Sequence, residues 1–155
     1  MLLDLLIIGM AAMPVIELTV TLPIALQTYG MDPPRALLDC YIGNALPVVP
    51  LLFGLRIFVN WCERKSPRFH KFMLNYFGRV RGRFQKHYDR YGALALFLYV
   101  AIPTPFSGVW SGAVAAVLFG IRPKYAAPAL IAGMMVAGLI VLGVTKGIVT
   151  GIHLF

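Results

Sequence analysis

The stretch Val100-Ala-Ile-Pro-Thr-Pro-Phe-Ser-Gly-Val-Trp110 (VAIPTPFSGVW) lies in the middle of the apolar region 92–120. Proline removes a backbone donor and clashes with the preceding helical turn, so Pro103 and Pro105 should break a helix here. Irregular backbone is tolerated at membrane depth only where it is buried in protein or lines a watery cavity. The stretch therefore predicts two short helices, 92–102 and 107–120, that form a hairpin with its tip near the bilayer midplane.

The composition is that of an integral membrane protein. Hydrophobic residues make up 59% of the chain and charged residues 13%, with a mean hydropathy of +0.79. That charged fraction is about half that of a soluble domain. We expect an all-α membrane protein with one domain spanning 1–155. Its apolar regions are 2–29, 36–61, 92–120 and 125–152.

The two halves of the chain share one pattern: a broken apolar segment, a Gly-x-x-Pro turn and a more continuous segment. Pro14 and Pro23 break the first segment as Pro103 and Pro105 break the third. A shift of ninety residues without a gap superposes Ala25 on Ala115, Gly30 on Gly120, Pro33 on Pro123, Ala36 on Ala126, Gly43 on Gly133 and Leu52 on Leu142. We interpret the chain as repeat one (1–61), a linker (62–91) and repeat two (92–155).

Internal repeats with broken helices are typical of transporters. If each broken segment re-enters on its own side, each repeat crosses once and the two repeats are inverted. Residues 61–91 and 121–124 are then cytoplasmic, which the positive-inside rule favours. If each broken segment spans instead, the chain crosses four times, and this alternative stays open.

The linker is strongly basic: nine of the fourteen Lys and Arg lie between Arg64 and Arg90. Its aromatic residues recur at spacings of three and four, which predicts an amphipathic helix on the membrane surface. We expect it to bind anionic lipid headgroups on the cytoplasmic face of the plasma membrane. Between membrane segments, such a basic block does not indicate nucleic-acid binding.

Glu17 is the strongest candidate for chemistry, because ionisable side chains inside apolar segments are costly and usually functional. At the start of a half-helix, the helix dipole would favour its charge while burial would oppose it, so the group could load and release a proton. Asp39 is a second candidate for coupling. A capping carboxylate with a structural role is the alternative for Glu17.

The second hairpin offers an anion site, because free N–H groups at the start of its second helix would face the tip. Residues proposed to bind substrate are Thr19, Asn44, Arg56, Thr104, Ser107, Gly108 and Trp110. Ser107 could instead be a simple helix cap, and Arg56 could extend to the interface. Cys40, Cys62 and the histidines show no metal-ligand spacing, so we expect neither metal, cofactor nor enzymatic activity.

The segments Pro14-Val-Ile-Glu-Leu18, Ile42-Gly-Asn-Ala-Leu-Pro47, Arg90-Tyr-Gly92 and Val100–Ala116 together resemble the small multidrug export family, a distant branch of the DedA superfamily. The resemblance implies two re-entrant hairpins that point at each other, and proton-driven transport. It departs from the family pattern at Thr19, where an arginine is expected, and at Phe106-Ser-Gly108, where Gly-Thr-Gly is expected.

The resemblance favours a proton-coupled transporter that flips a polyprenyl phosphate or another anionic lipid. A second hypothesis is an exporter in which Glu17 binds a cationic drug and aromatic side chains add cation–π contacts. A third is an uncoupled lipid scramblase or scaffold. Two crossings enclose little space, so a homodimer is expected.

Overall fold

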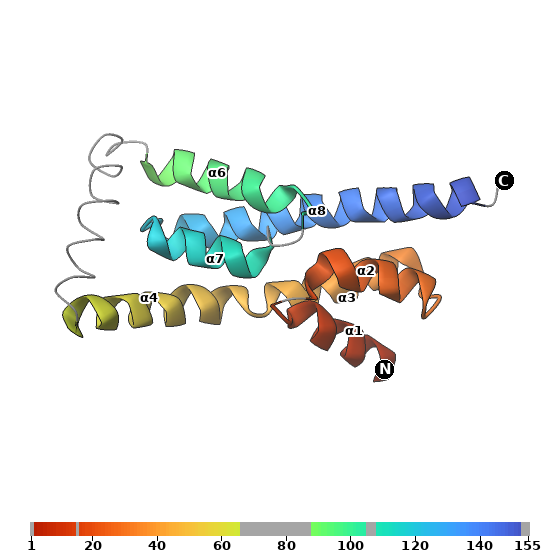
Figure 1. Ribbon diagram of the computed structural model, residues 1–155, viewed down its shortest axis with the longest axis horizontal. Helices are drawn as coiled ribbons and strands as arrows, with labels where there is room; N and C mark the ends of the chain where they lie inside the picture. The colour runs from red at the N-terminus through yellow and green to blue at the C-terminus, as the bar shows by residue number, and fades with distance from the viewer. Residues whose placement is uncertain (1, 15, 66–87, 105–107, 153–155) are drawn as a thin grey trace.

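The computed structural model describes residues 2–14, 16–65, 88–104 and 108–152, and its regular elements in these ranges are all helices. The helices are α1 (Leu2–Ala12), α2 (Glu17–Gln27), α3 (Pro33–Ala45), α4 (Val48–Lys65), α6 (Tyr88–Ala101), α7 (Val109–Leu118) and α8 (Pro123–Ile152). Figure 1 shows an elongated bundle in which α3, α4 and α8 run along the long axis. Of the expected linker 62–91, residues 62–65 belong to α4 and residues 88–91 to α6. Residues 66–87 and Pro105 lie outside the described residues.

Two helical hairpins, α1–α2 and α6–α7, occupy opposite ends of the bundle and turn their tips toward its middle (Figure 1). Their helices have 11, 11, 14 and 10 residues. At 1.5 Å per residue each helix is about 15–21 Å long, roughly half the thickness of a bilayer core or slightly more. Pro14 and Pro103 lie in the tip connections.

Pro23 does not break the first hairpin, contrary to the expectation from sequence. It lies inside α2, which continues to Gln27. Proline removes only its own N–H and bends the helix locally. Leu22 and Ala25 are fully buried on either side of it, and this packing holds the helix together.

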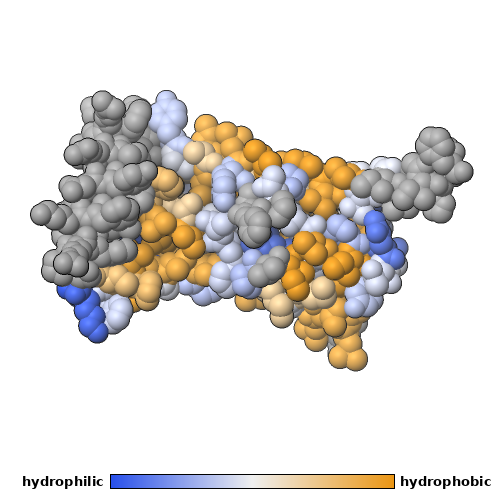
Figure 2. Space-filling view, viewed as in Figure 1, coloured by the Kyte–Doolittle hydropathy of each residue, from blue (hydrophilic) through white to orange (hydrophobic). Residues whose placement is uncertain are grey.

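The long helices supply the membrane-spanning length. Pro33–Cys62, which covers most of α3 and α4, and Pro123–Gly147 of α8 are long and apolar enough to cross a membrane. The first of these is interrupted at Leu46–Pro47. Along the bundle α3–α4 and α8 run in opposite directions (Figure 1). Figure 2 shows apolar side chains over much of the face, with hydrophilic ones gathered toward its two ends.

Close backbone contacts fix each hairpin to its own long helix. A Cβ on Gly43 of α3 would overlap the Ile8 carbonyl oxygen of α1. A Cβ on Gly133 of α8 would lie 2.8 Å from the Phe97 carbonyl oxygen of α6. The two glycines are ninety positions apart, so equivalent small residues make equivalent contacts in the two halves.

The halves also pack across each other: α4 lies against α7, and α8 lies against α2. The Tyr41 hydroxyl of α3 donates a 2.6 Å hydrogen bond to the Met135 carbonyl of α8. The Tyr41 ring occupies the space that a Cβ on Gly138 would need. The core between the hairpin tips is continuous across both halves, with fully buried Leu22, Val48, Val109 and Leu130.

Candidate functional site

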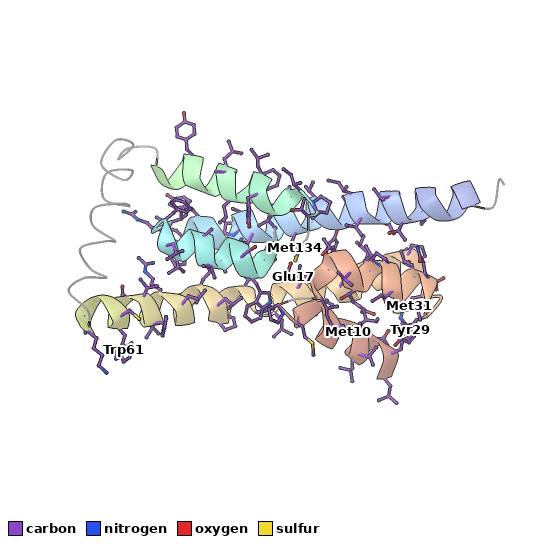
Figure 3. The ribbon with its side chains drawn as sticks, viewed as in Figure 1. Met10, Glu17, Tyr29, Met31, Trp61 and Met134 are labelled. Carbon is purple, nitrogen blue, oxygen red and sulfur yellow. The ribbon has the colours of Figure 1, made fainter. Side chains whose placement is uncertain are left out.

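Glu17 is the first residue of α2 and lies at the tip of the first hairpin, in the middle of the bundle (Figure 3). Its side chain is buried, with 8% exposed. Its φ of +31° falls in the left-handed region, and no other non-glycine residue of the described ranges has a positive φ. Such backbone strain persists only where surrounding structure enforces it, and it concentrates at functional sites.

The Glu17 carboxylate occupies the start of α7, in the other half of the molecule. Trp110 N–H donates a 3.3 Å hydrogen bond to Glu17 Oε1. The first N–H groups of a helix have no partner within the helix and carry the positive end of its dipole. The anion site predicted at this helix is therefore filled by a carboxylate of the chain itself.

Gly108, the residue before α7, makes this approach possible. A Cβ at this position would overlap the Glu17 carboxylate group. The Trp110 indole adds a second bond between the tips, because Trp110 Nε1–H donates to the Ala12 carbonyl oxygen at 3.2 Å. One residue of the second hairpin thus holds the first hairpin through both its backbone and its side chain.

A small cavity lies beside the Glu17 carboxylate. The volume that the centre of a water molecule can occupy in it is about 10 Å³. That space fits about one water. It is lined by Glu17, Leu18, Thr19, Asn44, Val100, Pro103, Gly108, Val109, Met134 and Ala137. Four of the predicted site residues, Glu17, Thr19, Asn44 and Gly108, therefore meet here.

The cavity walls combine equivalent positions of the two halves. Leu18 and Gly108, Thr19 and Val109, and Asn44 and Met134 are pairs separated by ninety residues, and all six line the cavity. Glu17 and Met134 lie close together in Figure 3. The side chains with polar atoms come from the N-terminal half, since the described lining residues of the other half are apolar.

Three buried oxygen atoms of the described residues accept and donate no hydrogen bond: Thr21 Oγ1, Asp39 Oδ2 and Asn44 Oδ1. Buried polar atoms are nearly always paired, so each such exception indicates an unassigned partner such as water or a ligand. Asn44 is 3% exposed and borders the cavity. Thr21 follows Glu17 by one turn of α2 and is fully buried.

Asp39 does not line the Glu17 cavity. It lies on α3 near Asp4 and Arg35, whose charges act on it. Arg35 binds Asp4 of α1 through two hydrogen bonds, both of 2.9 Å. This guanidinium holds the pKa of Asp4 well below its ordinary value. Asp39 thus belongs to a charged group between α1 and α3, separate from Glu17.

The other predicted site residues are scattered. Arg56 is exposed on α4, and Thr104 is exposed in the connection between α6 and α7. Ser107 lies outside the described residues. None of the described residues lining the Glu17 cavity is Lys, Arg or His.

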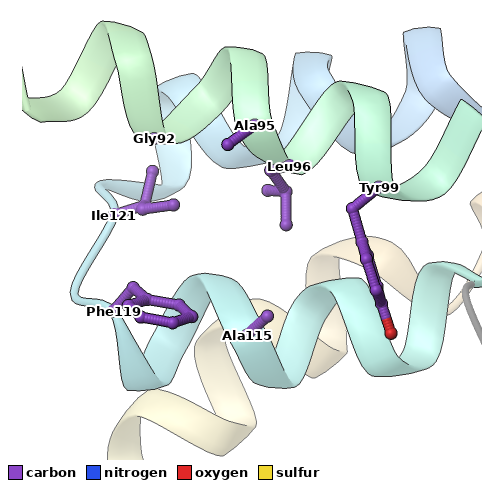
Figure 4. A pocket seen from close by; sticks show the side chains of 7 residues that line it. All are labelled: Gly92, Ala95, Leu96, Tyr99, Ala115, Phe119 and Ile121. Atoms are coloured by element: carbon purple, nitrogen blue, oxygen red, sulfur yellow. The ribbon is translucent and has the colours of Figure 1, made fainter.

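A second, larger hollow of about 510 Å³ lies between α6 and α7. Leu96 and Tyr99 of α6 face Ala115 of α7 and Phe119, the residue that follows α7, across it (Figure 4). Gly92, Ala95 and Ile121 complete its lining, which is almost entirely apolar. No residue that the sequence singled out for binding contributes to this groove.

The sequence did not indicate Met134, Val100 or Ala137 as cavity residues, because apolar side chains in a membrane segment carry no chemical signal. Only the ninety-residue shift could have found Met134, which is the equivalent of Asn44. The pairing of Glu17 with the amide of Trp110 was also missed, since it joins residues 93 positions apart.

Residues 17–140 match the family model described as "Putative small multi-drug export protein". The chain belongs to this family. The match begins at Glu17 and includes the whole cavity lining. No curated protein and no solved structure matches the chain. Its family and its two long apolar helices make it a membrane protein of an export family rather than an enzyme family.

Proposed function

We propose that this protein exports organic cations in exchange for protons, with Glu17 as the residue that binds either one. The observation that carries the proposal is the pairing of the buried Glu17 carboxylate with the start of α7. An ionised carboxylate away from water is costly unless it is paired. Its only described hydrogen-bond donor is the Trp110 backbone amide, and no cationic side chain is found among the described residues that line its cavity.

Two effects act in opposite directions on the charge of Glu17. The helix dipole and the Trp110 N–H favour the charged form, and burial favours the neutral form. A proton or an organic cation can therefore neutralise the same carboxylate. Because one group cannot hold both at once, proton binding releases the cation, which is the exchange that proton-driven export needs.

The cavity is too small for a drug-sized molecule, which occupies a pocket of about 300–1,000 Å³. We therefore assign this arrangement to a closed state and propose that the hairpin tips separate for loading. Neutralising Glu17 weakens its hydrogen bond to Trp110, since bonds to charged groups are stronger than neutral ones. The Trp110–Ala12 bond then remains as the weaker link between the tips.

We further propose that the two halves form inverted repeats with re-entrant hairpins in the plasma membrane. The half-bilayer length of the hairpin helices supports this arrangement. Arg64 and Lys65 end α4, and Arg122 and Lys124 flank the start of α8. These two helix ends lie at the same end of the bundle (Figure 1). The positive-inside rule makes that end cytoplasmic, with residues 61–91.

Two further proposals concern partners. The basic segment Arg64–Arg90 binds anionic lipid headgroups at the cytoplasmic surface, because each cation gains about 1 kcal/mol near such a surface. A homodimer would complete the wall around a loaded substrate, since within the described ranges each chain has two stretches that are long and apolar enough to span. Cysteine crosslinking in native membranes tests the dimer, and a monomer as the only product would exclude it.

The apolar groove between α6 and α7 favours a second candidate, the flipping of a polyprenyl phosphate or another anionic lipid. Its volume of about 510 Å³ and apolar lining suit hydrocarbon. The lipid phosphate would replace a protonated Glu17 at the start of α7. This candidate agrees with the proposed relation to the DedA superfamily. It is the weaker one, because the part of the cavity lining that the structure describes carries no positive charge.

Transport by purified protein in liposomes tests the proposal. Vesicles with an imposed pH gradient would receive either a fluorescent organic cation or a fluorescent polyprenyl phosphate, with wild type and Glu17→Gln compared. Gradient-driven cation uptake that Glu17→Gln abolishes supports export. Lipid flipping with the same dependence replaces export by the second candidate. Lipid flipping that depends neither on the pH gradient nor on the Glu17→Gln substitution would indicate a scramblase.

A further inference from the structure

Two side chains that line the Glu17 cavity present hydrogen-bond acceptors, the Glu17 carboxylate and the Asn44 amide oxygen. Thr19 also lines the cavity, and its hydroxyl can donate as well as accept. Glu17 presents a carboxylate whose Oε1 is bonded to Trp110 N–H. Asn44 Oδ1 has no hydrogen-bond partner, and the residue is only 3% exposed. These two groups line one cavity that admits about a single water-sized group.

An occupant that donates hydrogen bonds in two directions would satisfy both the Glu17 carboxylate and Asn44 Oδ1. A protonated primary amine has three N–H donors on one small, charged nitrogen, and water can take the same place when the amine is absent. A quaternary ammonium has the same charge and no donor. It would leave Asn44 Oδ1 unsatisfied.

We propose that the Glu17–Asn44 cavity binds the ammonium group of primary amines, and that Asn44 selects them over quaternary ammonium compounds. This inference rests on the proposed export function and specifies its substrate class. The Glu17 carboxylate attracts the positive charge, and Asn44 Oδ1 accepts a hydrogen bond from an ammonium N–H. Met134, at the equivalent position of α8, also lines the cavity and offers only a weakly accepting thioether sulfur.

Asn44 can be tested by substitution with leucine, which removes the unpaired acceptor together with the amide N–H groups, keeps the branched shape and enlarges the side chain. The matched control is Met134→Leu, which changes the same cavity without touching the Asn44 acceptor. Purified full-length protein in detergent would be titrated with hexylammonium or with hexyltrimethylammonium. Trp110 fluorescence and the shift in unfolding temperature would report binding.

Wild type should bind hexylammonium about tenfold more tightly than hexyltrimethylammonium, the ratio expected for one buried acceptor left unpaired. Asn44→Leu should bind both ligands equally, while Met134→Leu and Asn44→Asp should keep the preference. Equal binding by wild type, or a preference that survives in Asn44→Leu, would overturn the inference. If those results came with binding that Glu17→Gln abolishes, the export function would stand while the selectivity fell.

Discussion

The carboxylate of Glu17 lies in the space that a Cβ on Gly108 would need, and the two residues come from opposite halves of the chain. The contact sets Glu17 against the start of α7 and in reach of the Trp110 amide. A carboxylate in the first hairpin and a missing side chain in the second therefore form one unit. This relationship joins the two hairpin tips at the cavity.

Gly108→Ala should lower export by about tenfold or more while leaving the fold intact. The new Cβ would displace the flexible Glu17 side chain rather than rigid backbone, and misplacing a reacting group by about 1 Å costs activity on this scale. Export in liposomes and the unfolding temperature would both be measured. Gly143→Ala is the matched control, because a Cβ on Gly143 contacts nothing. Export that is unchanged in Gly108→Ala would contradict a role for the Glu17 position.

Trp110→Phe should destabilise the protein by about 1 kcal/mol and reduce export only partly. The substitution removes the indole N–H that bonds the Ala12 carbonyl. It keeps the backbone N–H that bonds Glu17. Thermal unfolding and liposome export would be compared with those of Glu17→Gln. A loss of export as complete as in Glu17→Gln, with unchanged stability, would mean that Trp110 binds substrate directly.

Gly43→Ala and Gly133→Ala should each destabilise the protein by about 1–3 kcal/mol, the usual cost of overpacking. Both glycines face the backbone of a neighbouring helix, which cannot move aside easily. Gly54→Ala, whose Cβ would meet nothing within 4 Å, should be neutral or slightly stabilising. Urea or thermal unfolding in micelles would measure all three. A neutral result at only one of the two positions would argue against equivalent packing in the two halves.

Asp4→Asn should leave the pH dependence of export between about pH 5 and pH 9 unchanged. Arg35 lowers the pKa of Asp4 in the folded protein. The ion pair therefore contributes its stability above the ordinary pKa of an aspartate and loses it only as the pH falls through the lowered pKa. Neither limit lies in the range tested. A pH profile shifted by Asp4→Asn would place a coupling group in the Asp4–Arg35–Asp39 cluster.

The sequence predicted the helical class and both hairpin turns at Pro14 and Pro103. It also singled out Glu17, which is buried at the start of α2 and whose role stays a prediction. These features leave local signals, since proline restricts the backbone and a carboxyl group is conspicuous among apolar residues. The expectation for Pro23 was wrong, because tertiary packing around Leu22 and Ala25 outweighs the local effect of a proline. A short helix that is held on both sides tolerates one missing hydrogen bond.

The arrangement of the site was less predictable than its members. Thr19, Asn44 and Gly108 were separate candidates in the sequence, and only the fold brings them to one cavity with Glu17. The start of α7 was expected to hold a substrate anion, and instead Glu17 fills it. Pairings across some ninety residues depend on how the two halves pack, which no local pattern encodes.

The most direct measurement is the proton release when an organic cation binds. Purified wild-type protein in weakly buffered detergent would receive hexylammonium, and a pH indicator would follow the protons freed. If Glu17 holds either a proton or the cation, wild type releases protons in proportion to the cation bound, and Glu17→Gln releases none. Cation binding without proton release in wild type, or equal release from Glu17→Gln, would contradict the exchange at Glu17.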